Sequence, residues 1–243
     1  EVGEDRVYDF SLGNPSIPAP VSVKEAILEL LKEPAESLHA YSPAPGDPKV
    51  RAVIAESLNR RFGESFTADH IFMTCGAAAS LSICLKALCN PGDEVITFAP
   101  FFTEYRCWVE ATGASLQVVP PRIPDFQIDT DVFEGMISPK TKAVIVNTPN
   151  NPSGVVYSEE TVQRVSEILR RKSEEYGAPI YLITDEPYRE IVYDDIQVPY
   201  LTKYYENTLV CYSYSKSLSL PGERIGYIVI PDRIADHEHV APA

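Results

Sequence analysis

The sequence has few cysteines and no long apolar run. Five cysteines are spread over 243 residues, and none of them forms a CxxC pair. That pattern is typical of reduced thiols in a cytoplasmic protein rather than of a disulfide framework. No run of 18 apolar residues occurs, so no membrane-spanning helix is expected. No signal peptide is visible at the start.

Basic side chains are also scarce. The chain has 21 Lys and Arg against 35 Asp and Glu, which gives a formal net charge of −14. Such a chain repels phosphate backbones and anionic membranes, so nucleic-acid and membrane binding are not expected. The composition is 44% hydrophobic and 23% charged, which is typical of a globular protein that buries a large core.

Several ligand-binding motifs are missing. Neither GxGxxG nor GxxxxGK[S/T] occurs, which disfavours a dinucleotide or nucleoside-triphosphate site. His237 and His239 flank Glu238, but this spacing lacks companion ligands, so no metal site is expected.

Short β-rich segments alternate with helical ones from about residue 70 onward. Helices are predicted at about 77–89, 103–112 and 158–176, and strands at Ile71–Thr74, Glu94–Phe98, Ser115–Val119, Ala143–Asn147, Ile180–Thr184, Leu209–Ser213 and Ile225–Ile230. The alternation predicts an α/β fold, with a mostly parallel seven-stranded sheet and helices on both faces. Ligands of such sheets bind beyond the carboxyl ends of the strands.

Residues 1–46 are rich in proline and contain one predicted helix. It begins near Ser22 and carries an apolar stripe of Val23, Ile27, Leu30 and Leu31. A second helix follows Asp47-Pro48 and ends at Gly63. Its expected apolar face consists of Val50, Val53, Ile54, Leu58 and Phe62.

Four predicted strands are followed by candidate site residues. These are Gly76, Ala77 and Ala78 after the first strand, Asn151 after the fourth, Asp185 and Tyr188 after the fifth, and Lys216 and Arg224 after the sixth. Each group also has an ordinary structural interpretation: tight packing, an Asn/Pro/Gly turn, a helix cap or a solvated charge.

Taken together, the four loops suggest one ligand. A helix start with free N–H groups can hold an anion, and a buried acid needs a cation. A partly desolvated Lys beside another cation loses its proton easily and can form a Schiff base. Ser213 and Lys216 also make a Ser-x-x-Lys pair, but the Ser-Asp-Asn and Lys-Thr-Gly motifs that accompany it in acyl transferases are absent. The combination fits a phosphorylated pyridine aldehyde.

The chain resembles the fold-type I pyridoxal-phosphate enzymes, specifically the class I/II aminotransferase family. The segment Ser213–Gly226 fits that family's lysine-site signature, and Asn151–Gly154 and Asp185–Tyr188 match its two other motifs in the expected order. The resemblance covers nearly the whole chain. It implies a pyridoxal 5′-phosphate cofactor and transfer of an amino group between an amino acid and a 2-oxo acid.

The resemblance also implies residue roles. Lys216 would form the Schiff base with the cofactor and move the substrate proton, and Asp185 would pair with the pyridine nitrogen. Tyr188 and Asn151 would hydrogen-bond the phenolic oxygen. The phosphate would be bound by Ser213, Arg224 and the backbone at Gly76, Ala77 and Ala78.

Three further residues match the family. Phe102 would stack on the pyridine, and Gly13, like Asn151, would lie beside the substrate. Tyr41 would reach the phosphate of a neighbouring subunit, which implies a homodimer.

The expected domains are an N-terminal segment at 1–46, belonging to a small domain and a dimer arm, and a large cofactor domain at 47–243. The C-terminal small domain, with its arginine for the substrate carboxylate, is expected to be missing. The same residues would serve a C–S β-lyase or a non-catalytic pyridoxal-phosphate-binding regulatory domain. The absence of a basic winged-helix segment disfavours the regulator. The amino-acid substrate stays open.

Overall fold

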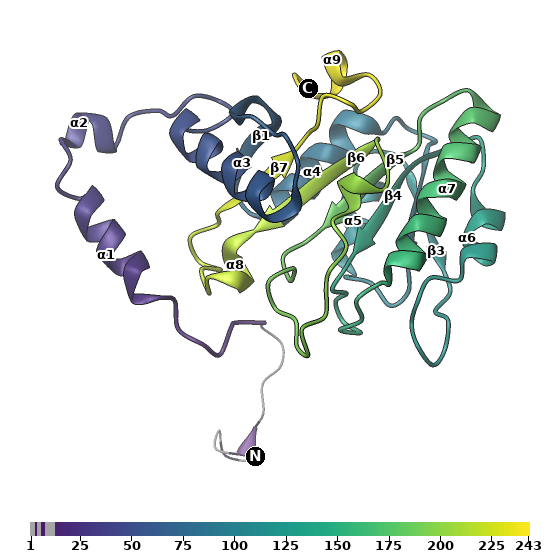
Figure 1. Cartoon of the computed structure of the whole chain (residues 1–243), viewed down its shortest axis with the longest axis horizontal. Helices are drawn as coiled ribbons and strands as arrows, with labels where there is room; N and C mark the ends of the chain where they lie inside the picture. Colours follow the sequence, from purple (N-terminus) through teal and green to yellow (C-terminus); the bar gives the residue numbers. More distant parts are fainter. Residues whose placement is uncertain (1–2, 4–5, 8–12) are drawn as a thin grey trace.

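The computed structural model describes residues 3, 6–7 and 13–243. In this part of the chain, seven strands form one sheet in the order β1-β7-β6-β5-β4-β2-β3 (Figure 1). Their bounds are Ile71–Thr74 (β1), Glu94–Phe98 (β2), Ser115–Val119 (β3), Thr141–Asn147 (β4), Tyr181–Asp185 (β5), Thr208–Ser213 (β6) and Gly226–Val229 (β7). Only β7 runs antiparallel to its neighbours. The predicted strands and the mostly parallel sheet are confirmed, with strand bounds within two residues.

Helices cover both faces of this sheet. The longer ones are Pro48–Phe62 (α3), Ala77–Leu88 (α4), Glu104–Glu110 (α5), Thr130–Met136 (α6) and Glu159–Tyr176 (α7); single turns occur at Tyr214–Ser217 (α8), His237–Val240 (α9), Ala68–His70 and Leu201–Lys203. Along β4, Ile145 packs into the core under α4 and α5, whereas Val144 and Val146 pack under α6 and α7. Figure 1 shows α7 and α4 on opposite sides of the sheet. Among the described residues, no helix is long and apolar enough to cross a membrane.

The apolar face predicted for α3 is partly wrong. Asp47 caps this helix by accepting from the amides of Lys49 and Val50, and Gly63 ends it at a φ of 67°. Val53, however, is 65% exposed, and Val50 is exposed as well. Arg51 is buried in their place, and its Nε donates to the carbonyl of Ile71 at 2.7 Å. The long apolar stem of Arg lets a charged residue lie on the buried face, which in α3 consists of Arg51, Ile54, Ala55 and Leu58.

Helix α6 was not predicted. It spans only seven residues and includes Gly135, so it is too short to show a clear apolar period. Its start is nevertheless fixed by Asp129, whose side chain accepts from the amide of Val132 at 3.1 Å. The single turn α8 was not predicted for the same reason of length.

The N-terminal segment contains two helices that are not packed into the core. These are α1 (Val21–Leu30) and α2 (Ala35–Leu38), and neither helix has a buried residue. The predicted stripe is present but uncovered by the described residues, with Ile27, Leu30 and Leu31 all exposed. Figure 1 shows both helices to one side of the molecule. Within 1–46, residues 1–2, 4–5 and 8–12 lie outside the described part, and the division between 46 and 47 stays a prediction.

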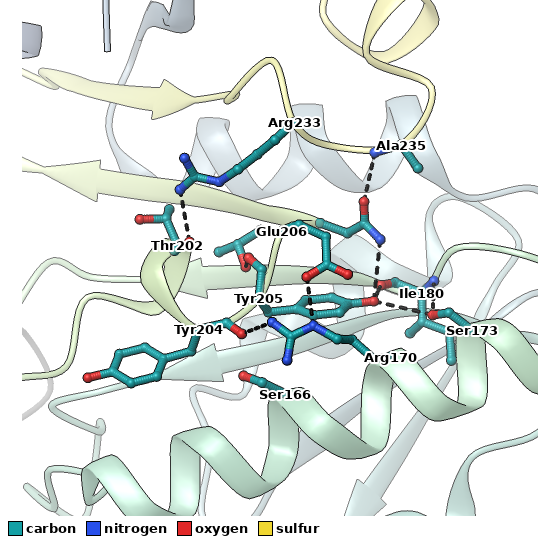
Figure 2. Close-up of polar contacts among 12 residues, drawn as sticks. Ser166, Arg170, Ser173, Ile180, Thr202, Tyr204, Tyr205, Glu206, Arg233 and Ala235 are labelled. Atoms are coloured by element: carbon teal, nitrogen blue, oxygen red, sulfur yellow. Dashed lines mark hydrogen bonds and ion pairs between the residues drawn. The ribbon is translucent and has the colours of Figure 1, made fainter. Parts of the chain in front are cut away.

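The amino ends of the strands are closed by polar contacts (Figure 2). Tyr205 donates from its hydroxyl to the carbonyl of Ile180 at 2.6 Å, directly before β5. Arg170 on α7 contacts Glu206 at 2.9 Å, in the connection that leads into β6. These contacts fix the β5–β6 connection at the amino ends of the parallel strands, opposite to the carboxyl ends.

The corrected face of α3 gives a stability prediction. Leu58 is 2% exposed, so Leu58→Ala should lower the free energy of unfolding by roughly 2–5 kcal/mol. Val53→Ala should change it by less than about 0.5 kcal/mol, because the side chain is exposed. Urea denaturation of both variants measures the difference. Equal losses of unfolding free energy would mean that Val53 is buried, as the apolar face predicted from the sequence requires.

Candidate active site

A cavity of about 490 Å³ lies at the carboxyl ends of the parallel strands. It brings together residues from the start, middle and end of the chain. The predicted site residues that line it are Gly13, Ala77, Ala78, Phe102, Asn151, Asp185, Tyr188, Ser213, Lys216 and Arg224. Gly76 directly precedes this lining, whereas Tyr41 is not part of it.

Asp185 is the last residue of β5, level with Asn147 on β4 and Cys211 on β6. It is 5% exposed. Its Oδ2 accepts a hydrogen bond from the hydroxyl of Tyr105 at 2.5 Å, while its Oδ1 has no partner among the described residues. Burial raises the pKa of the Asp185 carboxyl to about 7, and the hydrogen bond from Tyr105 acts in the opposite direction. A carboxylate with one unpartnered oxygen at a cavity is suited to receive a cationic N–H group.

Asn147 connects the two loops beside Asp185. Its side-chain amide donates to the carbonyl of Asp185 at 2.8 Å, and its Oδ1 accepts from the backbone N–H of Asn151 at 2.6 Å. Asn151 in turn donates to the hydroxyl of Tyr188 at 3.1 Å. Burial and the Asp185 charge raise the pKa of Tyr188, while the Asn151 bond lowers it. The sequence analysis did not single out Asn147, although a polar residue ending an apolar strand was a usable signal.

Lys216 lies on α8, the single turn that follows β6. Ser213 caps this turn by accepting from the amide of Ser215 at 3.1 Å. The Lys216 amine donates to the carbonyl of Gly13, which brings the N-terminal segment to the cavity. Partial burial lowers the pKa of Lys216, so more of the amine is in its neutral, nucleophilic form.

The start of α4 and Arg224 form a cationic corner of the cavity. Gly76 precedes α4 at a φ of 90°, and no side chain caps the helix, so its first N–H groups are available to an anion. A Cβ on Gly76 would lie 2.8 Å from Nη2 of Arg224, so the close approach requires glycine. The guanidinium also donates to the carbonyl of Pro221 at 3.1 Å.

Aromatic rings form one wall of the cavity. Phe102 lies 6.0 Å from Trp108 and 5.9 Å from Tyr105 between ring centroids. Tyr105 and Trp108 were missed by the sequence analysis. Their signal was a spacing of three residues from Phe102 to Tyr105 and again from Tyr105 to Trp108, which places all three on one side of the chain entering α5.

Tyr41 lies outside this arrangement. Its side chain is fully exposed, so its predicted contact with a neighbouring subunit stays a prediction. Among the described residues, no three His, Cys, Asp or Glu side chains come together as a metal site.

The raised pKa of Asp185 makes the ligand-free protein sensitive to pH. Because the folded-state pKa of about 7 lies above the ordinary 3.8, the folded state binds more protons between these values. Stability is therefore lost as the pH rises from about 4 to about 7. Asp185→Asn should remove this loss, so its stability relative to wild type should increase over that range, by about 1.4 kcal/mol per unit of raised pKa.

Urea unfolding of the intact, ligand-free protein at a series of pH values measures the effect. Ile183→Val, at a fully buried apolar position on the same strand, is the control and should differ from wild type equally at every pH. If the stability difference between Asp185→Asn and wild type does not change with pH, the pKa of the Asp185 carboxyl is not raised.

Comparisons with known proteins agree with this arrangement. The profile of the family described as "Aminotransferase class I and II" matches residues 5–239. The aspartate aminotransferase of Thermotoga maritima is 30% identical over 236 residues, which cover 96% of this chain and 60% of that protein. The probable aspartate/prephenate aminotransferase of Thermus aquaticus is 33% identical over 227 residues, covering 93% and 57%. The crystal structure of an aminotransferase from Eubacterium rectale aligns with a TM-score of 0.96 at 57% identity and covers 99% of this chain and 61% of that one.

The chain spans about 60% of the length of these relatives, which fits the prediction that a further domain lies outside it. The match to the family profile covers nearly the whole chain, and the mostly parallel seven-stranded sheet is the one that the resemblance implied. The chain therefore belongs to the class I and II aminotransferase family.

Proposed function

We propose that the intact protein is a pyridoxal-phosphate-dependent aminotransferase that moves an amino group between an amino acid and a 2-oxo acid. One observation carries the proposal: the Lys216 amine and the Asp185 carboxylate line the same cavity as the start of α4 and Arg224. An amine for an aldehyde, an acid for a pyridine nitrogen and a cationic corner for a phosphate are the three groups that this cofactor requires.

The residues fit the cofactor on structural grounds. The unpartnered Oδ1 of Asp185 is a buried acceptor that a pyridinium N–H would satisfy. Glycine at position 76 leaves room for close approach to Arg224, and the free helix start favours an anion there. When bound, pyridoxal phosphate supplies an electron sink that stabilises negative charge on the α-carbon of the substrate.

The protein's own groups divide the remaining work. Lys216 would hold the cofactor through its amine and would carry the proton to and from the substrate α-carbon. Asp185 would supply a negative charge to the pyridine nitrogen. Tyr188 and Asn151 would orient the phenolic oxygen, and Phe102 would pack against the ring and exclude water.

The phosphate would be held by Arg224, by Ser213 and by the N–H groups that follow Gly76. Ser213 is buried, and its hydroxyl bonds to that of Ser215 at 2.7 Å. Arg224 supplies the charge, and the backbone donors supply direction.

A second copy of the chain completes the proposal. The fully exposed Tyr41 and the uncovered apolar side chains of α1 support a homodimer, in which Tyr41 reaches the neighbouring site. A cytoplasmic location stays a prediction. Neither the site geometry nor the relatives named above favour the β-lyase or the regulatory alternative.

Replacing Lys216 tests the proposal directly. Lys216→Arg keeps the positive charge but cannot condense with an aldehyde, so borohydride should no longer fix the cofactor to the protein. Transfer from an amino-donor panel to 2-oxoglutarate should fall by on the order of 10³-fold or more. Peptide mapping after reduction and a transamination assay measure the two effects.

Lys203→Arg, at an exposed lysine outside the cavity, is the matched control and should retain both properties. Undiminished trapping in the Lys216 variant would remove the basis of the proposal. Pyruvate release from cystathionine without a 2-oxo acid would indicate the β-lyase instead.

Arg224 gives a separate test of the phosphate corner. Arg224→Gln should weaken binding of pyridoxal phosphate by roughly 10- to 100-fold, because a charge-assisted contact is lost. Binding of pyridoxal, which lacks the phosphate, should be unchanged. Equal losses for the two ligands, measured by equilibrium dialysis, would show that Arg224 acts elsewhere.

A further inference from the structure

Tyr105 is the one described side chain that hydrogen-bonds the Asp185 carboxylate. Its hydroxyl donates to Oδ2 at 2.5 Å, from α5 to the end of β5. Tyr105 is fully buried, and burial together with the Asp185 charge raises its own pKa well above the ordinary value. The phenol therefore keeps its proton and acts as a donor at neutral pH.

The ring of Tyr105 is held rigidly. It packs against Phe101, Phe102 and Trp108, with centroid distances of 6.3, 5.9 and 5.9 Å. It belongs to the same buried cluster as Val109, one turn further along α5. Because the ring cannot move freely, its hydroxyl fixes the position of Oδ2.

The two oxygens of Asp185 are therefore different. Oδ2 is engaged by the protein, whereas Oδ1 is unpartnered among the described residues, and the side chain lines the cavity. Hydrogen bonding to an ionised carboxylate favours the charged form, and burial opposes it. Tyr105 thus offsets part of the burial cost and leaves one oxygen for a ligand.

Other titratable groups surround this carboxyl. They are Glu186 directly after β5, Cys211 on β6, and Tyr188 and Lys216 at the cavity. Glu186 raises the pKa of Asp185. The only neutral donor to the carboxylate among the described residues is Tyr105.

We propose that Tyr105 is a positioning residue of the active site, whose hydroxyl holds Oδ2 of Asp185 so that the carboxylate keeps its charge and presents Oδ1 to the ring nitrogen of the cofactor. The proposal rests on the proposed function for its ligand. The contact itself belongs to the ligand-free chain and can be tested without the cofactor.

The test uses Tyr105→Phe in the intact protein, which removes one oxygen and keeps the ring packing. Infrared difference titration of the ligand-free protein follows the protonated carboxyl band, which Asp185→Asn identifies by its disappearance. The midpoint should rise by about one pH unit or more in Tyr105→Phe, because a hydrogen bond to a charged group is lost. Substituting 3-fluorotyrosine at position 105, a stronger donor, should lower the midpoint.

Tyr205→Phe is the matched control, since Tyr205 is equally buried and donates to a backbone carbonyl at the other end of β5. It should lower stability without moving the midpoint. An unchanged midpoint in Tyr105→Phe, or an equal shift in the Tyr205 variant, would overturn the proposal. If Tyr105→Phe does not fold, the fluorotyrosine protein decides the same question, and an unchanged midpoint there would overturn it.

Binding of pyridoxine 5′-phosphate, which has the ring nitrogen but no aldehyde, extends the test. One part of the pH dependence of its affinity should reflect ionisation of Asp185, and Asp185→Asn should abolish that part. In Tyr105→Phe this part should shift to higher pH by as much as the infrared midpoint does. If the wild-type protein binds no pyridine phosphate, the proposed function fails, while the infrared titration still decides the role of Tyr105. If this part of the pH dependence stays in place despite a shifted infrared midpoint, the claim that Oδ1 serves the ring nitrogen is overturned.

Discussion

Two adjacent acids are buried at the end of β5, and the rest of the site depends on how their charges are accommodated. Successive residues of a strand point to opposite faces of the sheet. Glu186 faces α3 and pairs with Arg189 at 2.6 Å, and the Arg189 guanidinium lies 4.7 Å from the ring of Tyr212. Asp185 faces α5 and has one phenol as its side-chain partner. The first acid is neutralised inside the protein, whereas the second leaves an oxygen for a cation from outside.

The sheet topology explains why the complementary groups meet at this point. Parallel strands bring their carboxyl ends to one edge, and the register places Asn147, Asp185 and Cys211 at the same level. The following loops then carry Asn151, Tyr188 and Lys216 into one cavity. The contacts of Tyr205 and Arg170 cover the amino ends of β5 and β6. The carboxyl ends of the strands are therefore the ones that remain open to ligands.

The strands were predictable because each is a short apolar segment bounded by turn residues, and the site loops were predictable because they follow those strands. The rotation of α3 was not, because Arg51 occupies a buried position through a backbone contact to β1 that no local pattern encodes. Tyr105 was missed for a related reason. Tyr105 and Asp185 are 80 residues apart in the sequence. Only the packing of α5 against the sheet shows that the Tyr105 hydroxyl donates to this acid.

The protonation of Asp185 links the empty and the loaded protein. Burial raises its pKa to about 7, so near neutral pH the ligand-free carboxyl is divided between its two forms. A cationic ring nitrogen at Oδ1 would stabilise the ionised form alone. Ring binding and ionisation of Asp185 then favour each other, since a coupling between two equilibria is reciprocal. Tyr105 sets the starting point of this linkage, because its hydrogen bond determines how much of the carboxylate is already charged before the ring arrives.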